Sequence, residues 1–187
     1  MILPIDEHIK LEVIAPHHAA DLLDVVNDNR QYLSRFLPWV GAMQKVSDFE
    51  RYIQQCEKLV SEKAEMSFVI LYHDVLVGRI GIHHINRHNQ NGAIGYWLAE
   101  TAGGKGIMLR CCRTVIDYGF DVLQLKRIEI RAATENVRSK AIPQKLGFTF
   151  EGVMRKAELV GDRLYDIAVY SMLWEEWTEY SNKSENC

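Results

Sequence analysis

Three glycines surround a lysine in the stretch ETAGGKGIMLRCC, residues 100–112, directly after a run of strand-forming residues. Gly103, Gly104 and Gly106 leave the backbone bare where a strand gives way to a helix. The first N–H groups of a helix lack helical partners and carry a partial positive charge, which suits a phosphate group. A tight strand–helix turn without a ligand would use the same glycines, and so short a pattern does not choose between the two.

A second polar group lies in the stretch ATENVRSKAIPQKLGF, residues 133–148. Asn136 stands where it can cap a short helix by accepting hydrogen bonds from its first free N–H groups. The side chain of Asn136 can instead contact a ligand that carries amides. Both stretches begin a helix after a strand, and two such units that are neighbours in a sheet form a ligand site at the carboxyl ends of their strands.

The elements that must position these residues follow from the spacing of apolar residues. Helices are expected over residues 16–33, 47–63, 105–123, 137–147 and 174–180, with Ser47 and Glu50 as a capping box for the second. Strands are expected over residues 8–14, 66–72, 75–85, 93–99, 126–132, 150–160 and 163–173. Strands in runs with helices between them predict an α/β or α+β fold built on a sheet of six or seven strands.

The composition is that of an ordinary globular protein, with 48% apolar and 25% charged residues among 187. We expect a single domain over residues 1–187, with 180–187 as a frayed tail. The net charge of −3 argues against nucleic-acid binding. No apolar run approaches the roughly 20 residues that would span a membrane. The four cysteines lack C-x-x-C spacing, which indicates neither a zinc site nor a disulfide framework and fits a reducing cytoplasm.

Together the two polar stretches resemble the GNAT superfamily of N-acyltransferases. The resemblance is carried by the strand IGYWLA, the turn GGKGIM, and the patterns EN-x-x-S-x-A-I-P-x-x-L-G-F and G-x-x-x-x-A-E. It runs from Ile9 to Trp174 and is strongest over residues 94–170. Within the superfamily, the chain is similar to the ribosomal-protein N-terminal serine acetyltransferases. The resemblance implies a mixed, mostly antiparallel sheet flanked by helices with a splayed central cleft, and acetyl-CoA as co-substrate without a metal.

The resemblance also implies how acetyl-CoA is bound. The superfamily's phosphate loop has Gln or Arg, two residues, Gly, one residue, and then Gly or Ala. Gly104 and Gly106 match its small positions, but Thr101 replaces the Gln or Arg, so one polar contact is lost while the backbone cradle remains. The end of the preceding strand would pair through its backbone with the pantetheine arm, which Asn136 would also contact. The expected cofactor-binding residues are Trp97, Leu98, Gly104, Lys105, Gly106, Ile107, Met108 and Asn136.

Transfer of acetyl to an amine needs a base for the amine proton and a donor for the leaving thiolate. Many superfamily members use a tyrosine four residues before the helix-ending glycine as this donor, and here that position is Pro143. In the serine acetyltransferase branch the matching donor is Ser139 and the matching base is Glu158. Pro143 would also leave the carbonyl of Ser139 without its helical partner. Without the resemblance, Ser139 is a small helix residue and Glu158 a solvated carboxylate; apolar neighbours would raise the pKa of Glu158.

Two other groups of residues invite a chemical role. His83, His84 and His88 stand close together, but no carboxylate or cysteine completes a metal site at a suitable spacing. Cys111 and Cys112 fall on the apolar face of the helix expected over residues 105–123, which favours buried structural cysteines over a nucleophile.

The acceptor and the assembly depend on the resemblance. Three aromatic residues either cover the acceptor site or belong to the core: Tyr32, Phe36 and Trp39. The resemblance favours a protein N-terminal amine as acceptor; a polyamine, amino acid or antibiotic, or a non-catalytic CoA-binding module, are the alternatives. It also suggests a homodimer that pairs through the apolar run LYDIAVYSMLW, residues 164–174, although the same run would suit a buried central strand.

Overall fold

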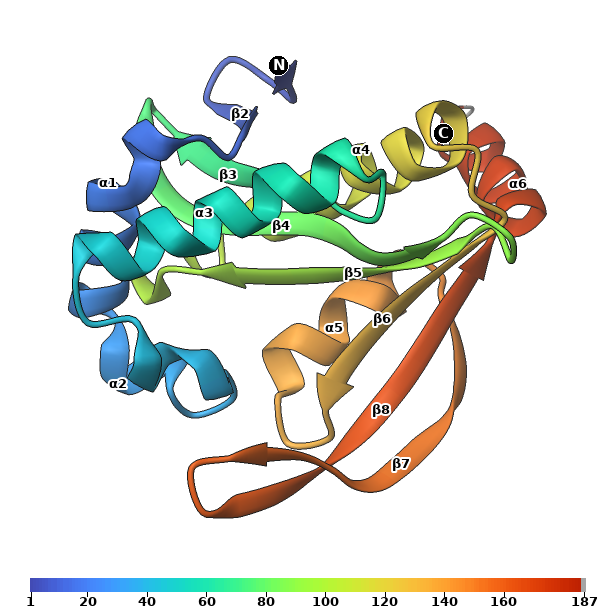
Figure 1. Cartoon of the computed structure of the whole chain (residues 1–187). Coiled ribbons are helices and arrows are strands. Elements are labelled where there is room, and N and C mark those ends of the chain that lie inside the picture. The colour runs from blue at the N-terminus through green and yellow to red at the C-terminus, as the bar shows by residue number, and fades with distance from the viewer. Residues whose placement is uncertain (186–187) are drawn as a thin grey trace.

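One eight-stranded sheet runs through the molecule, in the order β1–β2–β3–β4–β5–β6–β8–β7 (Figure 1). The computed structural model describes residues 1–185. Neighbouring strands are antiparallel except β5 and β6, which confirms the mixed, mostly antiparallel sheet. The predicted count of six or seven strands is wrong, because β1 has three residues and is too short to show alternation. The strands are β1 (Ile2–Pro4), β2 (Ile9–Val13), β3 (Met66–Tyr72), β4 (Val75–Asn86), β5 (Asn91–Leu98), β6 (Arg127–Ala133), β7 (Thr149–Val160) and β8 (Arg163–Leu173).

The helical segments follow the expected positions with two corrections. The single helix predicted over residues 16–33 is divided into a 3-10 turn and two helices, with a non-helical backbone at Asn29 between α1 and α2. The predicted capping box is also wrong: Asp48, and neither Ser47 nor Glu50, accepts hydrogen bonds from the N–H groups of Gln44 (3.0 Å) and Lys45 (3.1 Å). The segments are η1 (Pro16–His18), α1 (Ala19–Asp28), α2 (Arg30–Leu33), η2 (Pro38–Ala42), α3 (Val46–Ser61), η3 (Glu100–Ala102), α4 (Ile107–Asp117), the π-helical η4 (Tyr118–Val122), α5 (Val137–Lys145) and α6 (Trp174–Glu185).

The C-terminal helix continues beyond the expected length. The sequence predicts a frayed tail over residues 180–187, whereas α6 is helical to Glu185, and residues 186–187 lie outside the described part of the chain. Trp177 fixes α6 to α4 by donating its indole N–H to Asp117 at 2.7 Å. No helix within residues 1–185 has the length and apolar character needed to cross a membrane.

The helices pack on both faces of the sheet, and each face has its own buried cluster. On one face, Cys111 and Val115 of α4 pack with sheet residues such as Ile80 and Ile94. On the other face, α1 and α3 pack against β3 and β4 in a second cluster, which also contains Trp97 of β5. Burial of apolar side chains on both faces holds the strands that carry the candidate site in fixed positions.

The apolar run over residues 164–174 is not free to pair with another chain. It forms most of β8, which lies between β6 and β7 and is hydrogen-bonded to both. The suggestion that this run is a dimer surface is therefore wrong, and its alternative as a strand buried within the sheet is correct. The edge position belongs to β7 instead.

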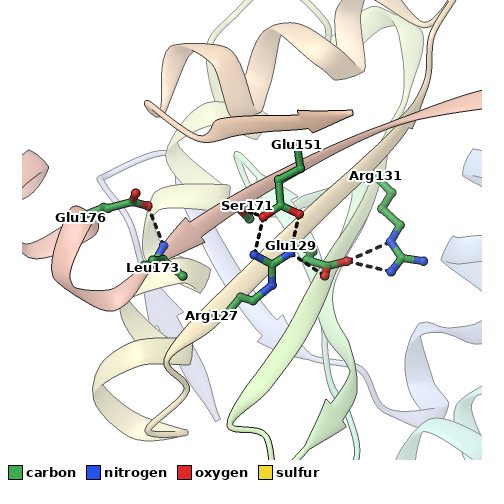
Figure 2. A network of polar contacts seen from close by, with 7 residues as sticks. All are labelled: Arg127, Glu129, Arg131, Glu151, Ser171, Leu173 and Glu176. Atoms are coloured by element: carbon green, nitrogen blue, oxygen red, sulfur yellow. Dashed lines mark hydrogen bonds and ion pairs between the residues drawn. The ribbon is translucent and has the colours of Figure 1, made fainter. Parts of the chain in front are cut away.

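A polar network ties β7 across β8 to β6 (Figure 2). Arg127 of β6 binds both carboxylate oxygens of Glu151 on β7, at 2.6 and 2.7 Å, and Ser171 of β8 donates to the same carboxylate at 2.7 Å. Arg127 also pairs with Glu129 at 2.8 Å, which in turn accepts from Arg131 at 2.8 Å. The Arg127 guanidinium lowers the pKa of Glu151 to about 2. This network fixes the strand on which Glu158 lies.

Candidate active site

The two parallel strands at the centre of the sheet separate part-way along their length. Pairing of β5 with β6 is limited to Asn91–Ile94 against Arg127–Ile130. Beyond it β5 stays paired with β4 as far as Leu98, while β6 stays paired with β8 as far as Ala133. Figure 1 shows the two strands diverging, with α5 beside the opening. The β6-facing edge of residues 95–98 therefore has no strand partner within the described chain, and an extended ligand can pair with it.

Trp97 and Leu98 both lie on this free edge, where the resemblance places the pantetheine arm. The Trp97 side chain is buried and packs against Trp39, with ring centroids 5.9 Å apart, on the face covered by α1 and α3. Leu98 packs against the cluster on the opposite face. Neither side chain is therefore available to a ligand at the edge. The Ala99 N–H donates to the Val77 carbonyl of β4, and the backbone groups of successive strand residues face opposite edges, so those of Leu98 face the free edge and those of Trp97 face β4.

The glycine turn follows β5 and begins α4. Gly104 (φ 79°) and Gly106 (φ 73°) both adopt the left-handed conformation that favours glycine, and a Cβ at either position would meet no atom within 4 Å. Gly106 is the N-cap and has no side chain to bind the helix start. The N–H groups of residues 106–109 accordingly have no hydrogen-bond partner among residues 1–185. These free N–H groups face open space, an arrangement that can bind a pyrophosphate.

The two residues that follow the turn can offer a ligand only their backbone groups. The side chains of Ile107 and Met108 are buried in the core, so these residues can present only N–H groups to a phosphate. Lys105 is exposed, and its ammonium lies over the ring of Tyr72 at 5.2 Å from the centroid. Thr101 is exposed at the position where the superfamily has Gln or Arg.

A cation that the sequence reasoning missed lies beside the turn. Nη1 of Arg138, on α5, is 3.7 Å from the position a Cβ would take on Gly103 and 3.5 Å from the Tyr32 hydroxyl. Arg138 has no ion-pair partner within 4 Å in the described chain, although the carboxylate of Glu100 is near enough to act on its charge. In the sequence, its one signal was its place directly before Ser139.

Asn136 begins α5 as the sequence predicts. Its Oδ1 accepts a hydrogen bond from the N–H of Ser139 at 3.1 Å, which confirms the capping role. Its Nδ2 has no hydrogen-bond partner among the described residues and is available to a ligand carbonyl. The two interpretations of Asn136 are therefore compatible, because Oδ1 caps the helix while Nδ2 stays free.

Ser139 is part-buried and contacts a tyrosine that the sequence reasoning missed. Pro143 lies inside α5 and supplies no N–H, so the carbonyl of Ser139 has no helical partner, as expected. The Tyr96 hydroxyl takes that place, donating to the carbonyl at 3.0 Å, and lies 3.3 Å from Ser139 Oγ. Burial raises the pKa of Tyr96 well above its ordinary value, so the phenol stays neutral.

Glu158 lies on β7, paired in register with Tyr165 of β8, directly after an irregular stretch of the strand. Within that stretch Lys156 has a left-handed backbone (φ 49°), and its N–H donates to Asp166 at 2.7 Å. Glu158 is half-buried, and burial alone raises the pKa of its carboxyl, the direction that its apolar surroundings predict. A carboxylate with a raised pKa accepts protons more readily near neutral pH.

Two contacts fix the β7–β8 hairpin to the segment that begins α5. The N–H of Thr134 donates to the carbonyl of Asp166 at 2.9 Å, and Arg163 pairs with Glu135 at 2.5 Å. Glu135 directly precedes Asn136. The hairpin that carries Glu158 is therefore held, through β8, to the residues that directly precede the helix of Ser139.

The three aromatic residues near α2 have different partners. Phe36 reaches across to Tyr165, next to Glu158, with ring centroids 5.7 Å apart, and packs on the small buried cluster of that hairpin. Tyr32 contacts Arg138 beside the glycine turn, and Trp39 packs on Trp97 in the core. Phe36 and Tyr32 border the candidate site, whereas Trp39 belongs to the core.

Within residues 1–185, the two cysteines of α4 and one group that contains two histidines have surroundings that disfavour a second reactive centre. Cys111 and Cys112 are buried, as the sequence predicts, and burial raises the pKa of Cys111 to about 12, which disfavours a thiolate. Among the described residues, Glu12, His17 and His18 lie close enough to share a metal ion. However, Nδ1 of His18 accepts from the Ala15 N–H at 3.0 Å, which leaves the ring proton on Nε2, the atom nearer Glu12.

Comparison with known proteins agrees with this geometry. The family model described as "Acetyltransferase (GNAT) domain" matches residues 8–149. The chain is a GNAT acetyltransferase. It is 32% identical over 174 residues to the putative ribosomal N-acetyltransferase YdaF of Bacillus subtilis, covering 92% of this chain and 95% of that protein. It is 26% identical over 171 residues to the ribosomal-protein-serine acetyltransferase of Escherichia coli, covering 91% and 96%.

The solved structures include one that holds the co-substrate. The microcin C7 self-immunity acetyltransferase MccE, solved with acetyl-CoA and AMP, superposes with a TM-score of 0.85 at 26% identity, covering 90% of this chain and 94% of that one. The acetyltransferase described here uses acetyl-CoA, as members of its family do. The separated strand edge and the free N–H groups of the glycine turn are the features of this chain that suit the cofactor.

Proposed function

We propose that this acetyltransferase moves an acetyl group from acetyl-CoA to a protein N-terminal amine, such as that of a ribosomal protein. The observation that carries the proposal is the set of free backbone donors at residues 106–109 beside an unpaired strand edge, with a half-buried carboxylate at the same open end of the sheet. The similarity to a ribosomal-protein-serine acetyltransferase supports the choice of acceptor.

Each expected residue has a role that its geometry permits. The free edge at Leu98 binds the pantetheine arm through its backbone together with the Asn136 amide, while the buried ring of Trp97 holds this end of β5 in place. The turn from Gly104 to Met108 binds the pyrophosphate through its N–H groups. Arg138 supplies a positive charge beside this turn, in place of the long side chain that Thr101 lacks.

The reaction needs two protein groups. Glu158 takes one proton from the ammonium of the acceptor, and the lone pair of the resulting neutral amine forms the new C–N bond to the acetyl carbonyl. Ser139 donates a hydrogen bond to the sulfur as the C–S bond breaks and negative charge gathers there. The nitrogen gives up its second proton as the amide forms, and the departing thiolate takes up a proton and leaves as the CoA thiol. The raised pKa of Glu158 brings its proton affinity closer to that of the amine, which makes the transfer easier.

Assembly and location follow from the same proposal. A ribosomal acceptor places the enzyme in the cytoplasm. We also propose a homodimer, now through β7, because this strand is the edge of the sheet and carries the exposed apolar side chains Phe150, Val153, Met154 and Leu159. An exposed apolar edge strand is a surface that proteins commonly cover.

Mass spectrometry of acetylated products tests the acceptor. The enzyme and acetyl-CoA are incubated with peptides that differ in their first residue, and in parallel with spermidine and free amino acids. We expect acetyl on the N-terminal amine of peptides that begin with Ser or another small residue, and none on a peptide whose N-terminus is already blocked. Acetylation of the small amines alone would refute the protein acceptor.

A further inference from the structure

The hydroxyl of Tyr96 lies against Ser139 at two points, 3.0 Å from its main-chain oxygen and 3.3 Å from its Oγ. Tyr96 is on β5 directly before Trp97, so this contact joins the free strand edge to the start of α5. A phenol has one proton, so Tyr96 donates in one of the two contacts and accepts in the other.

The carbonyl of Ser139 decides the direction. It can only accept, and Pro143 removes the N–H that would otherwise bind it. Tyr96 therefore donates to the carbonyl, and the Ser139 hydroxyl donates to the Tyr96 oxygen. A single phenol thus satisfies the backbone opening that Pro143 creates and holds the hydroxyl of the same residue.

We propose that Tyr96 is a positioning residue for acetyl transfer, which acts by holding the hydroxyl and the open carbonyl of Ser139. The proposal rests on the proposed role of Ser139 as donor. As negative charge gathers on the sulfur, the Ser139 hydroxyl turns from Tyr96 toward the sulfur. The Tyr96 hydroxyl can then turn to donate to Ser139 Oγ, which stabilises the serine while it donates. No proton leaves Tyr96.

A double-mutant cycle with Tyr96→Phe and Ser139→Ala tests whether Tyr96 acts through Ser139. Loss of one hydrogen bond to the donor should lower kcat about tenfold in Tyr96→Phe, with KM for acetyl-CoA within about twofold. In the Ser139→Ala background the same change should lower kcat by less than about twofold, because the hydroxyl that Tyr96 holds is already absent. A role in overall stability alone would give equal losses in both backgrounds.

Pro143→Ala separates the two contacts of Tyr96. Alanine restores the N–H that can donate to the Ser139 carbonyl, whereas it offers nothing to the Ser139 hydroxyl. In Tyr96→Phe/Pro143→Ala we expect the melting temperature lost in Tyr96→Phe to return while kcat stays low. Tyr170→Phe is the matched control, since it removes a hydroxyl from a buried tyrosine whose partner is Gln144 at 3.5 Å, and kcat should stay within about twofold.

The possible outcomes distinguish the role of Tyr96 from the role of Ser139. Wild-type kcat in Tyr96→Phe, equal losses in both backgrounds, or full recovery of kcat by Pro143→Ala would overturn the positioning role of Tyr96 while leaving the acetyltransferase activity intact. Unchanged kcat in Ser139→Ala alone would instead refute the proposed donor, and the role of Tyr96 with it.

Discussion

Replacing Glu158 by Gln removes the proposed base while it keeps the size of the side chain. Glu158 is half-buried on β7, and burial is the single cause of the raised pKa of its carboxyl. Gln cannot accept the amine proton, so turnover should fall about a hundredfold or more near neutral pH, the contribution of a positioned general base. KM for acetyl-CoA should not change, because the residues expected to bind it lie on β5, α4 and α5.

The loss in Glu158→Gln should shrink as pH rises. An α-amino group has a pKa of about 7.8, so its neutral fraction rises from about 2% at pH 6 to about 94% at pH 9. An acceptor that is already neutral needs no base. At the acid end, the wild-type rate should fall as pH drops through the raised pKa of Glu158, and the variant should lack this step.

Stability provides a readout that does not depend on turnover. Because the folded-state pKa of Glu158 lies above its unfolded value, ionisation of Glu158 opposes folding once the pH exceeds the unfolded value. Glu158→Gln should therefore melt at a higher temperature than the wild type at pH 7.5, and the difference should vanish below pH 4.

Glu151 on the same strand is the control with the opposite sign. Its pairing with Arg127 lowers its pKa to about 2, so the paired carboxylate stabilises the fold above the unfolded pKa and loses this effect as pH falls toward 2. Glu151→Gln should melt at a lower temperature at pH 7.5 and keep its base-dependent pH profile. Thiol release from acetyl-CoA, measured from pH 6 to 9 with the best peptide acceptor, tests whether Glu158 is the base. Wild-type turnover in Glu158→Gln across that range would refute the assignment of Glu158 as base.

Three further predictions concern cofactor, acceptor and assembly. Gly106→Ala should raise KM for acetyl-CoA roughly tenfold, because a Cβ would enter the open space over the helix start; Gly161→Ala, which has the same left-handed strain (φ 58°) and the same empty surroundings, should leave this KM unchanged. Phe36→Ala should raise KM for the acceptor and not for acetyl-CoA, since Phe36 packs on Tyr165 beside Glu158, whereas Trp39→Phe should change neither. Light scattering at micromolar concentration should give the mass of a dimer, and Met154→Lys on β7 should give that of a monomer; a monomeric wild type would contradict the dimer.

The elements could be predicted well where apolar residues repeat over several turns or strand pairs. The strand over residues 66–72 has the predicted bounds, and the hairpin turn at Gly161 lies where expected. Prediction failed where tertiary contacts decide. The strand β1 is held by pairing with β2 and has too few residues to show a pattern, and Asp48 binds the N–H groups at the start of α3 although Ser47 and Glu50 match a capping box.

The sequence predicted the backbone features of the site, but not the side chains from distant elements that contact them. A glycine-rich turn and a proline inside a helix act on the backbone next to them, so a single sequence can predict their effects. The turn at Gly104 and Gly106 and the open carbonyl of Ser139 were predictable for this reason. The groups that complete them come from elements distant in sequence. Tyr96 lies 43 residues before Ser139, and Phe36 reaches a hairpin from the other end of the chain. Nothing in local spacing predicts such pairs, because strand order and the separation of β5 from β6 create them.

The two departures from the superfamily pattern meet at the start of α5. Thr101 lacks the long side chain expected in the phosphate loop, and Arg138 lies beside that loop; Pro143 lacks a hydroxyl, and Ser139 offers one, held by Tyr96. Arg138 and Ser139 are consecutive, and a tyrosine from a different element contacts each of them. A displacement of α5 would therefore move the cation beside the cofactor phosphates and the proposed proton donor together. The contacts that set this helix thus link cofactor binding to chemistry, although no residue of α5 belongs to the glycine turn.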